Sequence, residues 1–279
     1  MKLQVIGDPV LHSKSPLLHG AMLAALGLDV PYTAKVVRRG ELPNYLAWAQ
    51  KNGVTGFNAT MPHKEDLLPL LDEIDPAART VGAVNTVCLR DGRWVGFNTD
   101  GAGAVAALED GLGIRPAGMT VTLLGAGGAA KAVALALSAA GAERVWVCNR
   151  TMERGEALCR QDPYRRAMPM DFAPATLAHL CRESRLLVNC TNLGMAGCPS
   201  QFEKWDFLDA LPDGAGVFDL IYHPAETELL SRARRRGLNT LNGLPMLVNQ
   251  AVLALERFLD RPLDRRAMAA VAEEALAQK

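Results

Sequence analysis

The feature that most restricts the fold is a short apolar run, residues 121–124, followed at once by Gly125-Ala126-Gly127-Gly128-Ala129-Ala130. The run predicts a buried strand. The small residues form G-x-G-x-x-A, in which the third small position lets a helix pack closely on the sheet. Residues 129–140 are almost all Ala, Val and Leu, and a second apolar run follows at 144–148. Together these segments make a βαβ unit whose helix N-terminus offers free N–H groups to a pyrophosphate, which predicts a dinucleotide site.

The residues after the second apolar run indicate which dinucleotide binds. Proteins that bind the ribose 2′-hydroxyl of NAD usually place Asp or Glu there, whereas this chain has Asn149-Arg150-Thr151 and then Arg154. The two arginines could bind a 2′-phosphate through charge-assisted hydrogen bonds, and Arg150 could also stack on the adenine. The alternative is that both are solvated residues at a helix start. Because arginine near a helix N-terminus opposes the macrodipole, a bound phosphate is the better explanation, and we predict NADP as the cofactor.

Length and charge limit the possible classes of protein. With 279 residues the chain can form two domains with full-sized cores. Its 30 basic residues balance its 30 acidic ones, so we expect no nucleic acid and no membrane as partner. The arginine-rich residues 232–236 precede Gly237 and are typical of a helix C-terminus.

Cysteine and histidine usage points to a reducing compartment without metal chemistry. The six cysteines show no C-x-x-C spacing and the five histidines no metal-ligand spacing, so we expect free thiols, no metal and a cytoplasmic location. No apolar run reaches the roughly 18 residues of a membrane span. The chain begins close to a strand, with no signal-like region. We expect a monomer or a homodimer.

The N-terminal part alternates between strands and helices. We predict strands at 2–6, 32–37 and 54–57 and helices at 15–27 and 41–52, with Ser15 as N-cap and Pro16 as the first helical residue. A helix is expected beyond Lys64 and a short one over 75–82. Asp91-Gly92 between two apolar runs predicts a hairpin, and residues 102–112 predict a further helix.

The same alternation continues in the C-terminal part. We predict strands at 186–190, 216–220 and 238–241, a helix over 227–236, and two final helices at 246–259 and 265–277. The final helices are too small to form a domain, so we expect them to pack back onto the first one. The predicted fold class is therefore α/β, with two domains.

Polar motifs at the ends of these elements resemble those of the shikimate dehydrogenase family over essentially the whole chain. Eight stretches match in order: Ser13-Lys14-Ser15-Pro16, Asn58-Ala59-Thr60-Met61-Pro62-His63-Lys64, Gly82-Ala83-Val84-Asn85-Thr86, Asn98-Thr99-Asp100-Gly101, the glycine loop, Asn149-Arg150-Thr151, Asp219-Leu220-Ile221-Tyr222 and Met246-Leu247-Val248-Asn249-Gln250. The resemblance implies an α/β substrate domain at residues 1–103, completed by helices within 243–279, and a Rossmann NADP-binding domain at residues 104–242. It also implies NADP-dependent, reversible reduction of 3-dehydroshikimate to shikimate in aromatic amino acid biosynthesis.

The chain departs from the family pattern at three positions. Ala59 stands where Val is usual, Gly20 follows His19 where a polar residue is common, and Pro245 replaces a usual Gly. The first two departures are peripheral. Pro245 is expected beside the active-site cleft and leaves the substrate preference open.

The resemblance and the residue chemistry together predict two sets of ligand-binding residues. The cofactor would contact Gly125, Ala126, Gly127, Gly128, Ala129, Asn149, Arg150, Thr151, Arg154, Leu220 and Gly243. The substrate would contact Ser13, Ser15, Asn58, Thr60, Asn85, Tyr222 and Gln250. The two serines lie at a helix start and could bind a carboxylate, although Ser15 could serve only as an N-cap. A Gln in an apolar helix needs a polar partner, which the ring hydroxyls of a substrate would provide.

Reduction of a ketone by hydride leaves a developing alkoxide that needs a proton. Lys64 and Asp100 are the candidate catalytic residues, because the resemblance places both at cleft-facing ends of their motifs. Without its surrounding motif, either residue would be interpreted as a charged residue on the protein surface. His63 is interpreted as structural. Tyr222 could reach the substrate carboxylate or could be a core aromatic residue.

Two alternatives stay open. A sister enzyme acting on quinate or an amino analogue could use the same Lys64 and Asp100, and quinate's additional hydroxyl would then be distinguished near Ser13, Ser15 and Tyr222. A non-catalytic NADP-binding sensor is an alternative of another class. The presence of both Lys64 and Asp100 argues against it.

Overall fold

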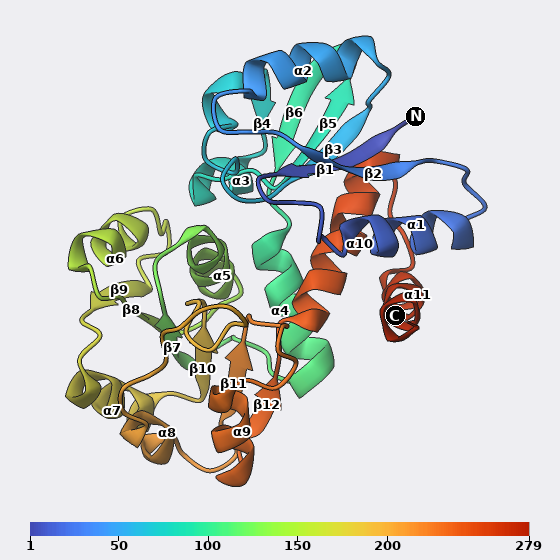
Figure 1. The fold of residues 1–279 in the computed structure, drawn as a ribbon. Helices are drawn as coiled ribbons and strands as arrows, with labels where there is room; N and C mark the ends of the chain where they lie inside the picture. Colours follow the sequence, from blue (N-terminus) through green and yellow to red (C-terminus); the bar gives the residue numbers. More distant parts are fainter. Residues whose placement is uncertain (279) are drawn as a thin grey trace. The chain divides into compact units, whose positions relative to one another are not determined.

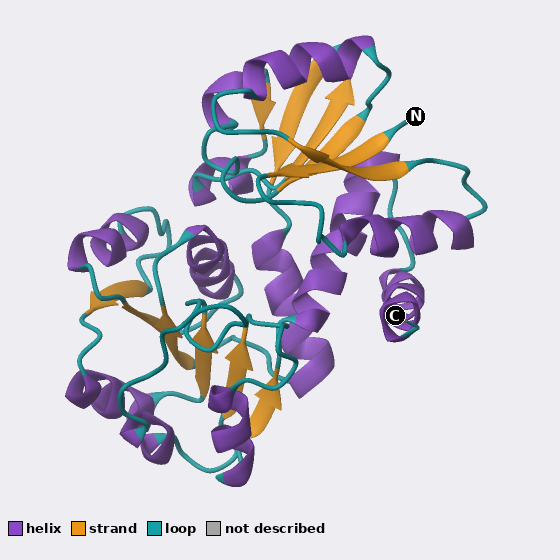
Figure 2. Cartoon of the chain, in the orientation of Figure 1, coloured by secondary structure: helices purple, strands orange, loops and turns teal. Residues whose placement is uncertain are grey.

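The computed structural model describes residues 1–278 as two compact units, each built on a six-stranded sheet (Figures 1 and 2). Unit 1 comprises Met1–Thr99 together with the residues from Val248 onward, and unit 2 comprises Asp100–Leu247. The predicted α/β fold class is confirmed. The units divide at the start of one helix and inside another, whereas we predicted the domain boundaries at 103/104 and 242/243.

The sheet of unit 1 is mixed, with strand order β2-β1-β3-β5-β6-β4. Its strands are β1 (Leu3–Gly7), β2 (Tyr32–Val36), β3 (Gly56–Ala59), β4 (Glu73–Ile74), β5 (Thr86–Arg90) and β6 (Arg93–Phe97). β1 runs parallel to β2 and β3, while β5 is antiparallel to β3 and β6. Asp91 and Gly92 join β5 to β6 with φ angles of 48° and 78°, the left-handed conformation that a two-residue hairpin turn requires, so the predicted hairpin is confirmed.

Helices cover both faces of this sheet: α1 (Ser15–Ala25), α2 (Leu42–Lys51), α3 (Pro76–Val81), the C-terminal part of α10 (Leu244–Leu259) and α11 (Arg265–Ala277). The apolar side of α2 packs against Phe57 and Trp94 in one core. On the opposite face α1 packs against α11 (Figure 1). The C-terminal helices therefore complete unit 1, as predicted.

Two local predictions in unit 1 are wrong. Helix α1 begins at Ser15 itself, and the hydroxyl of Ser13 accepts a hydrogen bond from the Ser15 N–H at 3.2 Å, so Ser15 is not the N-cap. The expected helix beyond Lys64 is instead a series of turns and a 3₁₀ turn at Leu68–Leu70. Pro69 lacks an N–H donor, which disfavours a longer helix, and the Lys64 carbonyl accepts from Val84 N at 2.7 Å instead of from its own segment.

The sheet of unit 2 is entirely parallel, with strand order β12-β11-β10-β7-β8-β9. Its strands are β7 (Thr120–Leu124), β8 (Arg144–Cys148), β9 (Ala167–Met170), β10 (Leu186–Asn189), β11 (Gly216–Asp219) and β12 (Asn239–Leu241). β9 was not predicted, because Pro169 breaks its apolar pattern and edge strands tolerate proline. The strand order reverses between β7 and β10, which is where ligands bind in doubly wound sheets.

Two cores lie on the two faces of this sheet. α4 (Asp100–Leu112), α5 (Gly128–Ala139) and α6 (Met152–Cys159) share one core with Val121 and Leu123. α7 (Pro174–Glu183), α8 (Asp206–Ala210) and α9 (Glu228–Arg235) share the other with Leu124. Figure 1 shows the two groups of helices on opposite sides of the sheet. This doubly wound arrangement follows from strands that are apolar on both faces.

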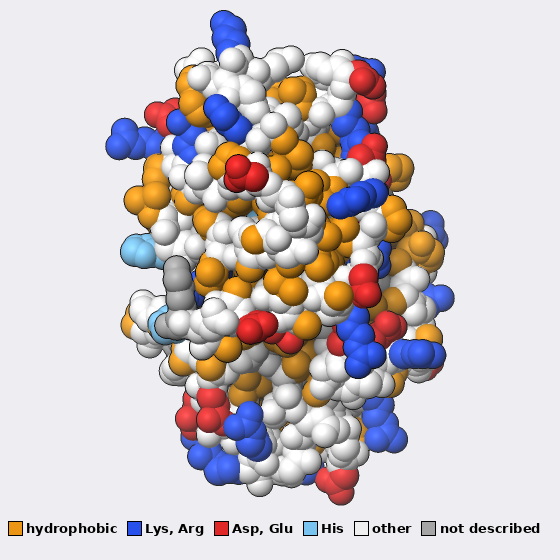
Figure 3. Space-filling model, turned by 90° about the vertical axis from the view of Figure 1, so that its right-hand side faces the viewer, with side chains coloured by type: hydrophobic (Ala, Val, Ile, Leu, Met, Phe, Trp, Pro, Cys, Tyr) orange, Lys and Arg blue, Asp and Glu red, His pale blue; other side chains and the backbone are white. Residues whose placement is uncertain are grey.

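Acidic and basic side chains are interspersed on the face shown in Figure 3, as the balanced composition predicts. The basic run near Gly237 forms the last turn of α9, where Arg232 pairs with Glu228 and Arg234 with Glu226, both at 2.7 Å. Within residues 1–278, the structure contains no helix with the length and apolar character of a membrane span.

Candidate functional site

The glycine loop of unit 2 joins β7 to α5 in the way the motif predicts. Gly125 has a φ of +106°, and a Cβ there would lie 3.3 Å from the backbone of Cys190, so both conformation and space favour glycine. A Cβ on Gly127 or Gly128 would meet open space. Ala130 is completely buried in the core between sheet and helix, where the third small residue belongs. The N-terminus of α5 therefore has room for an anionic group.

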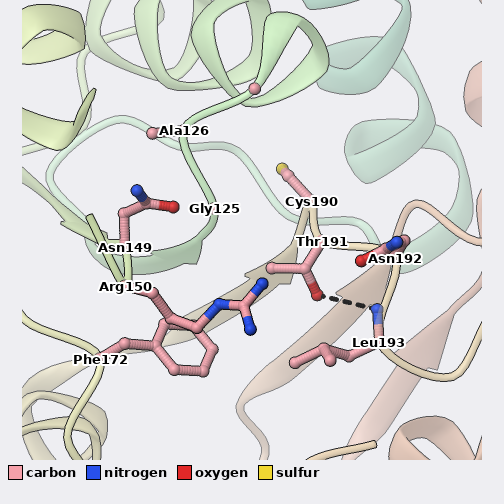
Figure 4. A pocket seen from close by; sticks show the side chains of 10 residues that line it. Gly125, Ala126, Asn149, Arg150, Phe172, Cys190, Thr191, Asn192 and Leu193 are labelled. Carbon is pink, nitrogen blue, oxygen red and sulfur yellow. Dashed lines mark hydrogen bonds between the residues drawn. The ribbon is translucent and has the colours of Figure 1, made fainter. Parts of the chain in front are cut away.

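A pocket of about 220 Å³ lies beside this loop (Figure 4). It is lined by Gly125, Ala126, Gly127, Asn149, Arg150, Phe172, Cys190, Thr191, Asn192 and Leu193. These residues follow the C-terminal ends of β7, β8, β9 and β10. The pocket therefore lies at the carboxyl edge of the sheet, next to the reversal of strand order.

The pocket is suited to a phosphorylated ligand. Among its described lining residues only Arg150 is charged, and its exposed side chain forms no ion pair within residues 1–278. Burial and the nearby Asp219 raise the pKa of the Cys190 thiol, which therefore stays neutral and adds no repelling charge. Phosphates at the helix N-terminus and near Arg150 would thus meet donors and a positive charge.

The other predicted residues after β8 are arranged around the start of α6. The Asn149 side chain donates to the Thr151 carbonyl at 2.8 Å, which closes the turn between strand and helix. Thr151 occupies the N-cap position with extended backbone. Arg154 is exposed one turn along α6 and is not among the residues that line the pocket. The contact of Arg154 with the cofactor stays a prediction.

Leu220 and Gly243 are held against each other by backbone packing. The Gly243 N–H donates to the Ile221 carbonyl at 3.0 Å, and a Cβ on Gly243 would overlap the Leu220 carbonyl. Glycine at this position is therefore required by the packing of the chain itself. The contact of both residues with a cofactor stays a prediction.

Unit 1 carries a buried polar network at the ends of its strands. The Tyr32 hydroxyl donates to Asn58 Oδ1 at 2.6 Å, and Asn58 Nδ2 donates to the Asn85 carbonyl at 3.1 Å and to Thr86 Oγ1 at 3.0 Å. Both amide hydrogens of Asn58 are thus used inside the unit. Asn58 thereby holds the Asn85 segment, and its contact with the substrate stays a prediction.

The same network continues to the residue before Asp100. Asn85 Nδ2 donates to Thr99 Oγ1, and the Thr99 N–H donates to Asn85 Oδ1, both at 2.9 Å. The hydrogen bond from Val84 N to the Lys64 carbonyl ties the Lys64 segment to the same stretch of chain. Asp100 is buried at the start of α4 and Lys64 is half-buried. Val84 and Asn85 together therefore connect the backbone segments that lead to the two predicted catalytic residues.

The remaining predicted substrate residues differ in exposure. Ser15 is buried, and Ser13, Thr60 and Gln250 are half-buried. Gln250 is thus less deeply buried than its apolar helix suggested. Tyr222 is 41% exposed, which excludes the core-aromatic alternative. His63 is completely buried, and its Nε2 lies 2.7 Å from the Val37 carbonyl, in agreement with a structural role.

Several residues of these sites were not predicted. The wall formed by Phe172 and residues 190–193 belongs to the loops that follow β9 and β10. Tyr32 and Thr99 belong to the network of unit 1. The polar residues after residue 189 were a usable signal, but the sequence does not show that β10 lies next to β7. Within residues 1–278 no group of three or more His, Cys, Asp or Glu side chains is arranged to hold a metal ion.

Comparison with known proteins identifies the two units separately. Residues 5–87 match the family described as shikimate dehydrogenase substrate binding domain, and residues 112–192 match the family described as shikimate/quinate 5-dehydrogenase. The NADP(+)-dependent shikimate dehydrogenase of Symbiobacterium thermophilum is 42% identical over 276 residues, which cover 97% of this chain and 93% of that protein.

Solved structures show the same likeness over the full length. Shikimate 5-dehydrogenase from Thermus thermophilus, in complex with NADP(H) and shikimate, has a TM-score of 0.83 and 38% identity, with 99% of each chain covered. Quinate dehydrogenase from Corynebacterium glutamicum, in complex with NAD, has a TM-score of 0.86 and 32% identity, with 97% of this chain and 98% of that chain covered. On this evidence the chain belongs to the shikimate dehydrogenase family.

Proposed function

We propose that the protein catalyses the NADP-dependent, reversible reduction of 3-dehydroshikimate to shikimate in aromatic amino acid biosynthesis. The choice of cofactor rests on the glycine-loop pocket. Among the lining residues that the structure describes, Arg150 is the only charged one. A carboxylate at this position would repel a 2′-phosphate, whereas a guanidinium binds one in a bidentate manner. The family membership supports the reaction.

The residues present fit NADP. The N-terminus of α5 would hold the diphosphate, and Arg150 would hold the 2′-phosphate. NADPH would supply the hydride for the reduction. Asn149 would keep Arg150 in place, because its side chain closes the turn at the end of β8.

The substrate would be bound and protonated by residues of the matched motifs. Ser13, Ser15 and Tyr222 would bind the carboxylate, while Thr60, Asn85 and Gln250 would bind the ring hydroxyls. Lys64, as an ammonium group, would donate a proton to the carbonyl oxygen as the hydride arrives, and Asp100 would orient Lys64 and the hydroxyl that forms. The network around Asn85 supports this assignment, because it anchors the segments that precede Asp100 and carry Lys64.

The decisive experiment is steady-state kinetics with shikimate and quinate, each with NADP and with NAD. We expect the highest kcat/KM for shikimate with NADP. A preference for quinate with NAD would instead indicate the activity named for the Corynebacterium glutamicum relative. Tight NADP binding without turnover of either substrate would indicate a sensor.

We also propose a cytoplasmic location and a monomeric or homodimeric state. The six cysteines are free thiols, which suits a reducing compartment. Fractionation of the native host and light scattering of the purified protein test the two proposals. Recovery in an extracytoplasmic fraction, or a mass above that of a dimer, would contradict them.

A further inference from the structure

Two neighbouring strands of unit 2 end in the same type of side-chain turn. At the end of β10, Asn189 Oδ1 accepts from the Thr191 N–H at 3.0 Å and from Thr191 Oγ1 at 2.7 Å. At the end of β11, Asp219 Oδ1 accepts from the Ile221 N–H at 3.1 Å. Asn189 and Asp219 lie opposite each other in the register of the two strands. Each side chain therefore organises the loop that follows its own strand.

A direct hydrogen bond couples the two turns. Asn189 Nδ2 donates to Asp219 Oδ1 at 3.0 Å, and the second carboxylate oxygen accepts from Thr227 Oγ1 at 2.6 Å. Both Asn189 and Asp219 are completely buried. Because a buried polar group without partners is costly, this network favours one arrangement of the three segments that it joins.

One end of the network forms part of the cofactor pocket. Thr191 lines the pocket, and its hydroxyl accepts from the Leu193 N–H at 3.2 Å, the bond drawn in Figure 4. Its methyl carbon would also lie 3.3 Å from a Cβ placed on Gly125. Asp219 itself is not among the lining residues. An effect of Asp219 on this wall of the pocket must therefore pass through Asn189 and the loop, whereas its bond to the Ile221 N–H acts separately, on the segment next to Leu220.

We propose that Asp219 is a positioning residue for NADP binding, acting through Asn189 to hold the pocket wall formed by residues 191–193. The proposal rests on the proposed cofactor. Asp219 would thus affect NADP binding without touching the cofactor. Loss of the carboxylate would release the Asn189 amide, and the wall opposite Arg150 would no longer be held in a single conformation.

The test is the dissociation constant for NADP, measured by calorimetry on the full-length protein without substrate. Asp219→Ala should raise this constant by about tenfold, or about 1.4 kcal/mol. Asp219→Asn should restore it to within about twofold of the wild type, because its amide oxygen can still accept from Asn189 and Ile221. In a Thr191→Val background, Asp219→Ala should have little further effect, since the hydrogen bond between the Thr191 hydroxyl and Asn189 is already lost.

Asp162 provides a matched control in the same unit. This buried carboxylate accepts from Ser138 Oγ and from the backbone N–H groups of Tyr164, Arg166 and Ala167, at 2.7 to 3.1 Å. It holds the loop that enters β9, whereas Asp219 lies where β11 ends. Asp162→Ala should lower the melting temperature but leave the dissociation constant for NADP unchanged.

The possible outcomes separate this inference from the proposed function. An unchanged constant in Asp219→Ala, or an equal rise in Asp162→Ala, would overturn the positioning role while leaving the cofactor in place. Failure of the wild type to bind NADP would overturn both proposals. If Asp219→Ala does not fold, Asn189→Ser breaks the link to Asp219 but keeps a hydroxyl for the Thr191 turn. This variant should also weaken NADP binding, and unchanged binding would refute the proposal that Asp219 acts through Asn189.

Discussion

At the scale of single residues, Arg150 and Arg154 occupy different places around the start of α6. Both are exposed arginines close to the start of α6. Arg150 lines the pocket beside the glycine loop, whereas Arg154 lies outside the described lining. Arg150 is the second residue after β8, while Arg154 is the third residue of α6.

Replacing Arg150 with Ala is expected to raise KM for NADP at least about tenfold, which corresponds to about 1.4 kcal/mol. KM for NAD should change little, because NAD lacks the 2′-phosphate. Arg160→Ala, at the C-cap of α6, is the control and should leave KM for NADP unchanged. The measurement is initial rates with both cofactors at saturating shikimate. Equal weakening toward NADP and NAD would mean that Arg150 only stacks or packs.

Lys64 and Asp100 are expected to act as one proton-handling unit. Lys64→Ala should lower kcat by roughly a hundredfold to ten-thousandfold, the usual contribution of one positioned acid–base group. KM for shikimate should change far less, because the interaction is made mainly in the transition state. The double variant with Asp100→Asn should be much less impaired than the product of the two single losses. A fully multiplicative double variant would refute the shared role.

At the scale of elements, most of the strands and helices follow from local patterns, and the exceptions have identifiable causes. The hairpin of β5 and β6 needs only Asp91-Gly92 and two apolar runs. The segment after Lys64 forms turns and a 3₁₀ turn instead of an α-helix, because Pro69 lacks an N–H donor and the Lys64 carbonyl accepts from the distant Val84. The short β4 exists through pairing with β6 alone. The residues within such a segment do not indicate which distant residues it will pair with.

Helix α11 offers a test of how a capping residue stabilises unit 1. Asp264 Oδ1 accepts from the Ala267 N–H at 3.1 Å, and α11 packs against α1. Asp264→Ala should reduce the free energy of unfolding by about 1 kcal/mol, whereas Asp264→Ser should retain most of it. Urea denaturation of the two variants measures the difference. Equal losses in both would show that the cap is not the stabilising interaction.

At the scale of the whole molecule, a buried histidine links stability to pH. His19 is completely buried, stacks on Tyr32 with ring centroids 4.3 Å apart, and has no hydrogen-bond partner for either ring nitrogen within residues 1–278. Burial lowers the pKa of His19 to about 3. Below the ordinary histidine pKa of about 6.5, the unfolded chain binds a proton that the folded protein does not. The free energy of unfolding therefore decreases as the pH is lowered from about 6.5 toward 3.

The variant His19→Phe should remove this dependence while keeping a ring against Tyr32. We expect the wild type to lose stability between pH 7 and pH 5, and the variant to lose much less over the same interval. Urea unfolding at each pH supplies the measurement. The difference between the two proteins isolates His19, because the other four histidines and the carboxylates are present in both. Parallel curves for the two proteins would contradict the assignment.

The sequence alone determined the features that depend on short stretches of chain. The hairpin, the glycine loop and the motifs with Lys64, Asp100 and Arg150 each lie within a few neighbouring residues, where turn geometry and helix-end chemistry act. The βαβ unit lies within one continuous segment, residues 120–148. The order of the strands was decided only by the tertiary structure. That order brings Asn189 beside Asp219 and residues 190–193 beside the glycine loop. The physical reason is that buried hydrogen bonds and pocket walls join residues far apart in sequence, and their partners are set by packing of the whole unit.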